Sequence, residues 1–487
     1  MEERAIRGIP WTLLAYGGNK FLTVATTLVL ARLLVPEDFG LAALAWMAMV
    51  LFTLFRDLGV GGVLIMDQEL DEHAKGTIFT LVLTTGVVAT TLAAAVSPVA
   101  ATVFEEPRLT LVLVVLSSTM LISSPGWFYE ALMQRELEFR KRFWATTMQS
   151  LVYLPVAVSL AALGAGVWSL IVGQIAGTIV YTVAFVVLAP YRVRPAFGTT
   201  SARRTLRLGR GFIFQGGLDF LRGNADTIAI SRVLGTAPLG LYSLAYNLSN
   251  VPSRGIADPL ARVTFPAFAR MRGRGEDVGP SFLSGLQLVA LVTCPLGVVL
   301  SGVADPFVRA VLGEKWVAMT GALAVLGIWA AARSIEVTMS WLLNSVGRAD
   351  LLAGISGVVL LVAAPMFFVA AELGGIEAVA WVAVGDMVAS LLAIAWHLQR
   401  REGIALVDQW RVLWPVLAAG TAAWGGSRAI ADALDGAPAA VALIAGCAAG
   451  ALVYAAVVNV LAPTLFGSAR RQVARAIGRR RAVVAGT

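Results

Sequence analysis

Apolar segments long enough to cross a lipid bilayer recur along the whole chain, and they constrain its fold more than any other feature. A bilayer core of about 30 Å needs about 20 apolar residues per helix. Fourteen segments meet this requirement, at 10–31, 38–58, 77–103, 109–133, 143–163, 166–190, 211–232, 238–262, 281–303, 318–345, 351–371, 376–398, 410–430 and 438–461. We therefore predict an all-α, polytopic membrane protein with about 14 transmembrane helices, the first of them an uncleaved span.

The composition agrees with a protein embedded in lipid. Of the 487 residues, 58% are hydrophobic and 14% are charged, whereas about a quarter of a soluble domain is charged. The two cysteines lie in different apolar segments, and the two histidines are far apart in the sequence. We therefore expect neither a disulfide framework nor a metal site, and no bound cofactor.

Basic residues are distributed unequally between the two sides of the predicted helices. With the N-terminus in the cytoplasm, most of the 38 Lys and Arg residues lie on the cytoplasmic side, which is the positive-inside pattern of inner-membrane proteins. The largest clusters, at 191–210 and 467–481, would lie against anionic headgroups. The net charge of +8 therefore indicates membrane lipids and not nucleic acid, with docking of a biosynthetic enzyme as the alternative. Both termini are expected in the cytoplasm.

An internal repeat divides the chain into two halves. At an offset of 200 residues, 31–45 aligns with 231–245, and Arg, Leu, Gly, Leu, Leu and Ala coincide. Parallel repeats of this kind recur in secondary transporters, while chance similarity between apolar segments is the alternative. Asp38 in the first copy suits a helix N-cap. The predicted domains are an N-terminal six-helix bundle at 1–190, a basic cytoplasmic linker at 191–210, a pseudo-symmetric six-helix bundle at 211–400, and two extra helices with a basic tail at 401–487.

Ionisable residues within the predicted spans are the informative polar features. An unpaired charge near the bilayer centre costs about 3 kcal/mol, so the cations must be paired or must line an aqueous cavity. Polar residues follow one face of the seventh span, from Gln215 to Asp226, and one face of the eighth, from Asn247 to Arg262. Such stripes favour the walls of a water-filled cavity. The cavity candidates are Lys20, Arg56, Asp219, Arg222, Asp226, Asn250, Arg254 and Asp258.

Two other interpretations of these charges stay open. Three pairs have the spacing at which side chains neutralise one another within a helix, namely Asp219/Arg222, Arg254/Asp258 and Arg333/Glu336. Asp386 in the twelfth span is a candidate for binding a coupling cation or proton, because an intramembrane acid is a functional candidate by default.

Several classes of enzyme are excluded by missing motifs. The sequence contains no Gly-x-x-x-x-Gly-Lys phosphate-binding loop, no Gly-x-Ser-x-Gly elbow and no His-Glu-x-x-His zinc motif. ATP hydrolysis is therefore not expected, and we predict that the chain is not an enzyme. A membrane glycan ligase or polymerase is the rival interpretation, in which Asp305 or Glu314 of the external segment 304–317 would act as acid or base.

Six short stretches carry a family resemblance when they are taken together. They are Ala31–Leu44, Arg135–Arg140, Gly166–Leu170, Asn224–Asp226, Leu239–Tyr242 and Gly313–Trp316. In combination they resemble the polysaccharide flippases of the colanic acid and teichuronic acid exporter type, the Wzx-type members of the multidrug/oligosaccharidyl-lipid/polysaccharide (MOP) superfamily. The resemblance covers roughly residues 5–400 and leaves the last two spans without a specific match.

The resemblance implies a V-shaped pair of bundles in the bacterial inner membrane. The resemblance also implies that the protein flips an undecaprenyl-diphosphate-linked oligosaccharide from the cytoplasmic to the outer leaflet by alternating access. A Na⁺ or H⁺ gradient or the membrane potential would drive this movement. A polysaccharide polymerase is an implied partner. Related lipid II flippases use arginines on the first, second and eighth helices, which Arg56 and Arg254 match by helix position, while the first helix offers Lys20. Efflux of cationic or amphipathic drugs by an ion-coupled antiporter is the alternative, and it would favour acids such as Asp219.

Overall fold

The fold is helical throughout the part of the chain that the structure describes. This computed structural model describes residues 18–19, 22–57, 64, 71–136, 138–258, 260, 268 and 270–462. The chain divides into two compact units: unit 1 comprises Met1–Leu244 and Ser356–Val379, and unit 2 comprises Ala245–Ile355 and Ala380–Thr487. The predicted all-α fold is confirmed, while the predicted domain boundaries stay a prediction.

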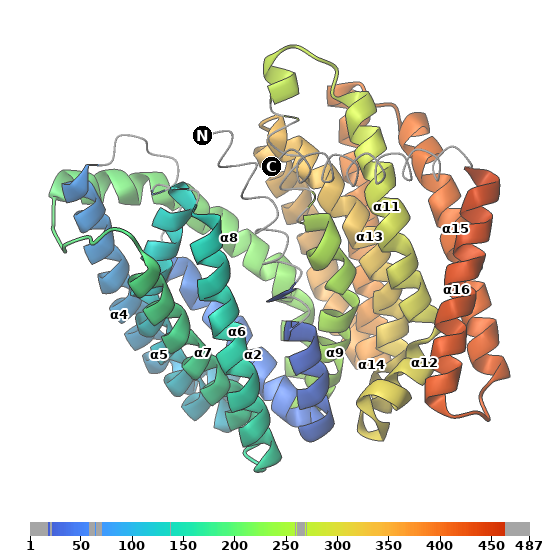
Figure 1. The fold of residues 1–487 in the computed structure, drawn as a ribbon, viewed down its shortest axis with the longest axis horizontal. Coiled ribbons are helices and arrows are strands. Elements are labelled where there is room, and N and C mark those ends of the chain that lie inside the picture. Colours follow the sequence, from blue (N-terminus) through green and yellow to red (C-terminus); the bar gives the residue numbers. More distant parts are fainter. Residues whose placement is uncertain are drawn as a thin grey trace, which may run out of the picture. The chain divides into compact units, whose positions relative to one another are not determined.

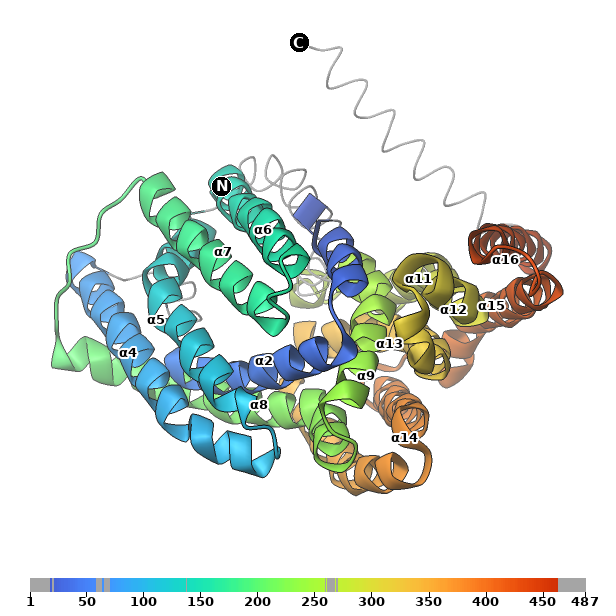
Figure 2. The ribbon, with the colours of Figure 1, turned by 90° about the horizontal axis from the view of Figure 1, so that it is seen from below.

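Unit 1 is built around four long helices that pack side by side (Figures 1 and 2). They are α4 (Glu72–Val103), α5 (Arg108–Arg135), α6 (Phe139–Ala162) and α7 (Val167–Leu188). Helix α2 (Pro36–Asp57) packs against α4, α5 and α7, and α8 (Thr199–Val233) packs against α2 and α4. A Cβ on Gly126 of α5 would lie 2.8 Å from the Cα of Thr182 on α7, so glycine is required where these two helices meet.

Unit 2 centres on α11, which packs against α13 and α15. Its helices are η1 (Ser253–Ala257), α11 (Gly279–Gly302), α12 (Ala304–Phe307), η2 (Val308–Leu312), η3 (Glu314–Met319), α13 (Thr320–Ser345), α15 (Leu406–Ala433) and α16 (Ala439–Leu461). A Cβ on Gly302 would overlap the hydroxyl of Ser427, so α11 and α15 approach closely. The Tyr454 hydroxyl of α16 donates a hydrogen bond of 2.9 Å to the Leu291 carbonyl. The two extra C-terminal helices are therefore packed onto α11.

Nine helices within the described residues are long and apolar enough to cross a bilayer. The predicted span 10–31 lies partly outside the described residues. Its described part belongs to a shorter apolar helix, Leu22–Leu33. Helices α8 and α15 lack a sufficiently apolar stretch, and α9 (Thr236–Ser249) has 14 residues before the π-helical turn η1. Each of these predicted spans nevertheless contains helix, so the multi-pass architecture is as expected.

A single break separates two predicted spans inside the longest helix, α14 (Ala349–Glu402, 54 residues). Gly374 and Gly375 have non-helical dihedral angles, and Gly375 has φ of 62°, which glycine adopts without steric cost. The predicted spans 351–371 and 376–398 are therefore the two arms of α14.

The two copies of the sequence repeat cross each other at their glycines within unit 1. Helix α2 begins at Pro36 and α9 begins at Thr236, the two positions that the repeat aligns. A Cβ on Gly40 would overlap the backbone carbonyl of Thr236, and a Cβ on Gly240 would overlap the backbone carbonyl of Pro36. This reciprocity is what a repeat related by a local axis predicts.

The carboxylate of Asp38 joins the start of α2 to the start of α7. Because α2 begins at Pro36, Asp38 lies in the first turn and not at the expected N-cap position. Its Oδ2 accepts a 3.4 Å hydrogen bond from the N–H of Val35, which is the reach-back contact of a capping box. Its Oδ1 accepts a 2.9 Å hydrogen bond from the N–H of Val167. The repeated turn and the Gly166–Leu170 motif therefore meet at one carboxylate.

Candidate functional site

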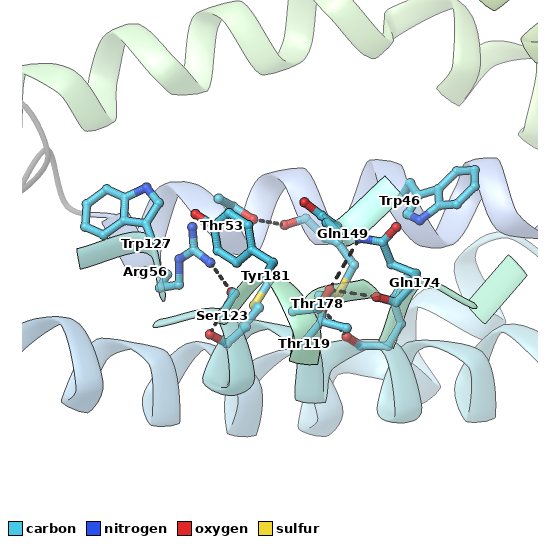
Figure 3. Close-up of a pocket in the computed structure, with 13 residues that line it drawn as sticks. Trp46, Thr53, Arg56, Thr119, Ser123, Trp127, Gln149, Gln174, Thr178 and Tyr181 are labelled. Atoms are coloured by element: carbon cyan, nitrogen blue, oxygen red, sulfur yellow. Dashed lines mark hydrogen bonds between the residues drawn. The ribbon is translucent and has the colours of Figure 1, made fainter. Parts of the chain in front are cut away.

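A pocket in unit 1 opens between α2, α5, α6 and α7 (Figure 3). Its volume of about 240 Å³ is below the range of about 300–1,000 Å³ for pockets that hold drug-sized ligands. The lining residues are Trp46, Met49, Thr53 and Arg56 of α2, Leu116, Thr119, Met120, Ser123 and Trp127 of α5, Gln149 of α6, and Gln174, Thr178 and Tyr181 of α7. Polar and aromatic side chains thus converge inside a bundle of membrane-length helices.

Arg56 and Trp127 lie at one end of this pocket (Figure 3). Arg56 is 8% exposed. Its Nε donates to Oδ1 of Asp57 at 2.7 Å, and its Nη1 donates to Oγ of Ser123 at 2.7 Å. The guanidinium carbon lies 5.6 Å from the centre of the Trp127 ring, within the range of a cation–π contact. The charge of Arg56 is therefore already balanced by a neighbouring carboxylate.

Amide and hydroxyl groups occupy the other end of the pocket, next to Trp46 (Figure 3). Nε2 of Gln174 lies 3.5 Å from Oγ1 of Thr178, at the long limit for a hydrogen bond. The Thr178 hydroxyl donates a hydrogen bond of 2.7 Å to the main-chain carbonyl of Gln174. Because the contact between the two side chains is long, the Gln174 amide keeps most of its capacity to bind a ligand.

Glycines on α7 bring the α6 side of this pocket close to the α7 side. A Cβ on Gly173 would lie 2.9 Å from the Cβ of Ala157, and a Cβ on Gly177 would lie 3.3 Å from the carbonyl oxygen of Gln149. Both distances are shorter than ordinary van der Waals contacts. The close packing of α6 and α7 therefore places Gln149 near the amide end of the pocket.

A hydrogen-bonded network fixes the Tyr181 wall of the pocket. The Tyr181 hydroxyl donates to Oε2 of Glu130 at 2.5 Å, and Nη2 of Arg142 donates to Oε1 of the same carboxylate at 3.0 Å. Hydrogen bonds to a charged group are stronger than neutral ones. The sequence patterns did not single out Glu130 or Arg142, although these residues hold α5, α6 and α7 together beside the pocket.

Two of the predicted cavity residues of α8 make hydrogen bonds within unit 1. Oδ2 of Asp226 accepts a 2.8 Å hydrogen bond from the Tyr242 hydroxyl of α9. Nη1 of Arg222 donates a 3.1 Å hydrogen bond to Oγ of Ser356 on α14. These contacts give both side chains a role in joining helices, while their predicted role in binding substrate stays a prediction.

The remaining candidates in unit 1 are less informative. Asp219 is exposed on α8. Lys20 lies outside the described residues, and so does the side chain of Gln215. Of the unit 1 candidates that the structure describes, Arg56 lies in the pocket.

Asn250 and Arg254 flank the start of the π-helical turn η1 in unit 2. Asn250 is 4% exposed, and its Oδ1 has no hydrogen-bond partner among the described residues. Arg254 is exposed. A π-helical turn is frequent at functional sites, and a buried acceptor without a partner is costly. That this turn binds substrate stays a prediction.

Arg333 of α13 forms the predicted pair with Glu336, with 2.5 Å between Nη1 and Oε2. Ser340 donates a further hydrogen bond of 2.9 Å to Oε1 of the same carboxylate. Asp258 and Asp386 both lie near enough to act electrostatically on Arg333. Binding of a coupling ion by Asp386 stays a prediction.

The two acids of the enzymatic interpretation share one arginine on the surface of unit 2. Nε of Arg309 lies 3.0 Å from Oδ2 of Asp305, and Nη1 lies 3.1 Å from Oε2 of Glu314. This ion-paired cluster accounts for both carboxylates without a reaction.

Sequence reasoning missed most of the pocket because each lining residue is an isolated polar or aromatic residue in an apolar helix. A weak signal does exist, since Trp46, Thr53 and Arg56 share one face of α2 by helical spacing. Gln174, Thr178 and Tyr181 share one face of α7 in the same way. Only the packing of four helices shows that these faces meet.

Solved structures with the same fold are membrane transporters. The lipid II flippase MurJ in an inward closed conformation aligns with a TM-score of 0.77 over 94% of this chain and 100% of its own, at 12% sequence identity. A multidrug resistance MATE family transporter of the MOP superfamily, in an inward-facing conformation, aligns with a TM-score of 0.64 over 79% of this chain and 95% of its own, at 13% identity. The chain therefore shares its fold with these two proteins.

The sequence narrows this class to one family. A family described as "Polysaccharide biosynthesis protein" matches residues 29–321, and the chain belongs to this family. The lipopolysaccharide biosynthesis protein WzxC of Escherichia coli (strain K12) is 28% identical over 353 residues, which are 72% of each chain. The teichuronic acid biosynthesis protein TuaB of Bacillus subtilis (strain 168) is 29% identical over 406 residues, 82% of this chain and 83% of the relative.

These comparisons confirm the resemblance that the sequence motifs predicted. They also confirm a multi-pass protein of a bacterial inner membrane. The cytoplasmic orientation of the termini stays a prediction.

Proposed function

We propose that this chain flips an undecaprenyl-diphosphate-linked oligosaccharide from the cytoplasmic to the outer leaflet, for the biosynthesis of a cell-surface polysaccharide. The observation that carries the proposal is the polar pocket inside membrane-length helices of a chain from the polysaccharide biosynthesis family. Sugars and a charged diphosphate are expensive to move through hydrocarbon. A polar interior removes much of that cost, while the polyprenyl tail stays in lipid.

Alternating access supplies the movement in this proposal. Repeat-related halves of secondary transporters expose their binding surface to one side of the membrane and then to the other. Here the repeat copies meet at Gly40 and Gly240, where two backbones touch without side chains between them. A Na⁺ or H⁺ gradient or the membrane potential drives the cycle, with Asp386 as the proposed site of ion coupling.

Membrane lipids and biosynthetic enzymes are the proposed partners. The basic segments 191–210 and 467–481 attract anionic headgroups when both chain termini lie in the cytoplasm. The same segments are the proposed docking site for a polysaccharide polymerase or another biosynthetic enzyme.

The direct test is the leaflet in which lipid-linked oligosaccharide resides in cells that lack this chain. We expect complete repeat units to accumulate on the cytoplasmic leaflet, out of reach of a periplasmic glycosidase, and the wild-type gene to restore their exposure. Normal exposure in cells without a redundant flippase would contradict the proposal.

Two arginine variants test the predicted substrate contacts in the same assay. We expect Arg254→Ala and Arg222→Ala to abolish export while the protein remains in the membrane. Arg411→Ala is the matched control, because its side chain is 74% exposed and pairs with Asp408 on the surface of α15. Full export by both test variants would remove these two arginines from the substrate site.

Drug efflux is the second candidate function, and the fold shared with a multidrug transporter supports it. In that case overexpression would raise resistance to cationic drugs, and Asp219→Asn would abolish the effect. We expect no change across a broad drug panel.

A further inference from the structure

We propose that the pocket between α2, α5, α6 and α7 binds an uncharged sugar ring of the oligosaccharide, at a place separate from the site that holds the diphosphate. This inference rests on the proposed function and assigns one part of the substrate to one pocket. It follows from the charge, the hydrogen-bonding groups, the aromatic walls and the size of the pocket.

The charge of the pocket argues against a diphosphate. Arg56 is the single cation among the described lining residues, and its Nε is 2.7 Å from the Asp57 carboxylate. Its Nη1 donates a hydrogen bond to Ser123, and its guanidinium lies over the Trp127 ring. Diphosphates are held by several charge-assisted donors, whereas this pocket offers one arginine that is already neutralised.

The hydrogen-bonding groups suit sugar hydroxyls. The side-chain amides of Gln149 and Gln174 each carry donors and an acceptor. The hydroxyls of Thr119 and Thr178 donate to main-chain carbonyls of their own helices, and their oxygens can still accept a hydrogen bond from a ligand. A sugar hydroxyl likewise donates one hydrogen bond and accepts others. Figure 3 shows these four side chains gathered at the end of the pocket away from Arg56.

The aromatic walls suit the faces of a sugar ring. Trp46 and Trp127 stand at opposite ends of the pocket, with Tyr181 between them (Figure 3). All three are partly buried, so their rings reach the pocket surface. A flat aromatic face buries the apolar C–H face of a sugar, while the hydroxyls at the ring edge reach the amides.

The apolar floor and the size of the pocket limit what it accepts. Leu116 and Met120 are 1% and 2% exposed and close the α5 side. The volume of about 240 Å³ suits one ring better than a whole repeat unit. A site built to hydrogen-bond a hydroxyl rejects analogues that lack it, so this pocket would distinguish repeat units by one sugar.

Binding to the purified full chain in lipid nanodiscs tests the inference with two probes. One probe is the free oligosaccharide, released from its carrier by mild acid, and the other is undecaprenyl diphosphate without sugar. The variants are Gln174→Leu and Trp46→Ala, and the control is Trp424→Ala, a half-exposed tryptophan of α15 outside the pocket. We expect about tenfold or greater loss of affinity for the free oligosaccharide in both variants, and none in the control.

Undecaprenyl diphosphate provides the opposite expectation. It should bind the wild type, Gln174→Leu and Trp46→Ala equally well. The inference is overturned if the two variants lose affinity for undecaprenyl diphosphate, because the pocket would then hold the diphosphate. It is also overturned if they bind the free oligosaccharide as the wild type does.

A third variant controls for misfolding. Thr178→Val preserves side-chain shape at a buried position and removes the hydroxyl, so it should fold and still weaken oligosaccharide binding. The leaflet assay in cells lacking the chain is independent of all these variants. A failure of flipping there removes the proposed function, whereas unchanged oligosaccharide binding in the variants removes only the assignment of the pocket.

Discussion

The two copies of the repeat begin alike and then differ in what their polar side chains contact. At both starts a glycine meets the backbone of the other copy. Beyond that crossing, α2 carries Arg56 into an open pocket, whereas α8 and α9 are joined by the hydrogen bond between Asp226 and Tyr242. The same backbone pattern therefore leads to a pocket in one half and to a link between helices in the other.

The largest effect on stability is expected when a methyl group is added to a glycine at the crossing of the two copies. We expect Gly40→Ala and Gly240→Ala to destabilise the protein similarly, at the upper end of the range of about 1–3 kcal/mol that overpacking typically costs. The reason is that each new Cβ overlaps a backbone carbonyl, which cannot rotate away. Thermal melting of the purified protein and its amount in the membrane measure the effect.

Gly223→Ala is the matched control for this prediction, because a Cβ there meets nothing within 4 Å. It should leave the melting temperature unchanged or raise it slightly, since alanine favours a helix. Equal melting temperatures for Gly40→Ala and the wild type would show that the copies do not cross this closely.

Substitution of Asp226 tests whether the second copy supplies a link between helices. We expect Asp226→Ala to cost about 1–3 kcal/mol, because it leaves the hydroxyl of Tyr242, which is 2% exposed, without its carboxylate partner. Asp226→Asn keeps an acceptor and should cost less. Melting temperature and export per folded molecule should be measured together.

Export per folded molecule decides the role of Asp226. A structural link predicts normal export by the molecules that still fold. A loss of export at normal stability would instead support the sequence-based assignment of Asp226 to the substrate cavity.

Glu106 gives a smaller, pH-dependent effect next to the second copy. Its Oε1 accepts a 2.9 Å hydrogen bond from Arg108, which lowers the pKa of the carboxyl below its usual 4.5. Because the pKa is lower in the folded state, the stabilisation is present above pH 4.5 and is lost as the pH falls through the lowered value. As the pH falls below 4.5, the melting temperature of the wild type should therefore fall relative to that of Glu106→Gln. A difference between the two that does not change with pH would contradict this.

The smallest effect is expected for the acids that lie away from both copies. Asp305→Asn with Glu314→Gln removes an exposed ion-pair cluster around Arg309, which solvent screening keeps weak, so the melting temperature should hardly change. Glycan chain length and export should stay normal. A changed chain length would restore the interpretation of the chain as a ligase or polymerase.

Sequence reasoning anticipated the features that depend on local patterns. Apolar length marked the spans, and the break at Gly374 and Gly375 falls between two of them. The repeat alignment placed Gly40 opposite Gly240, and the structure brings these residues together. The pair of Arg333 and Glu336 followed from helical spacing.

Features that depend on packing between distant segments were not predictable in the same way. Gln149 and Gln174 are isolated polar residues in different apolar helices, and they line one pocket because Gly173 and Gly177 let those helices approach. Asp226 was assigned to a cavity from its place on a polar face. Its hydrogen bond to Tyr242 depends on the path of the chain between α8 and α9, which periodicity does not encode.

The crossing of Gly40 and Gly240 has a consequence for the rate of conformational change. Where two helices interlock through side chains, turning one against the other requires rotamers to leave their wells and neighbouring groups to repack. At the Gly40–Gly240 contact no side chains interlock, so rotation of one helix against the other requires no repacking there. A methyl group at either position would therefore slow the exchange between conformations, even in molecules that still reach the folded state.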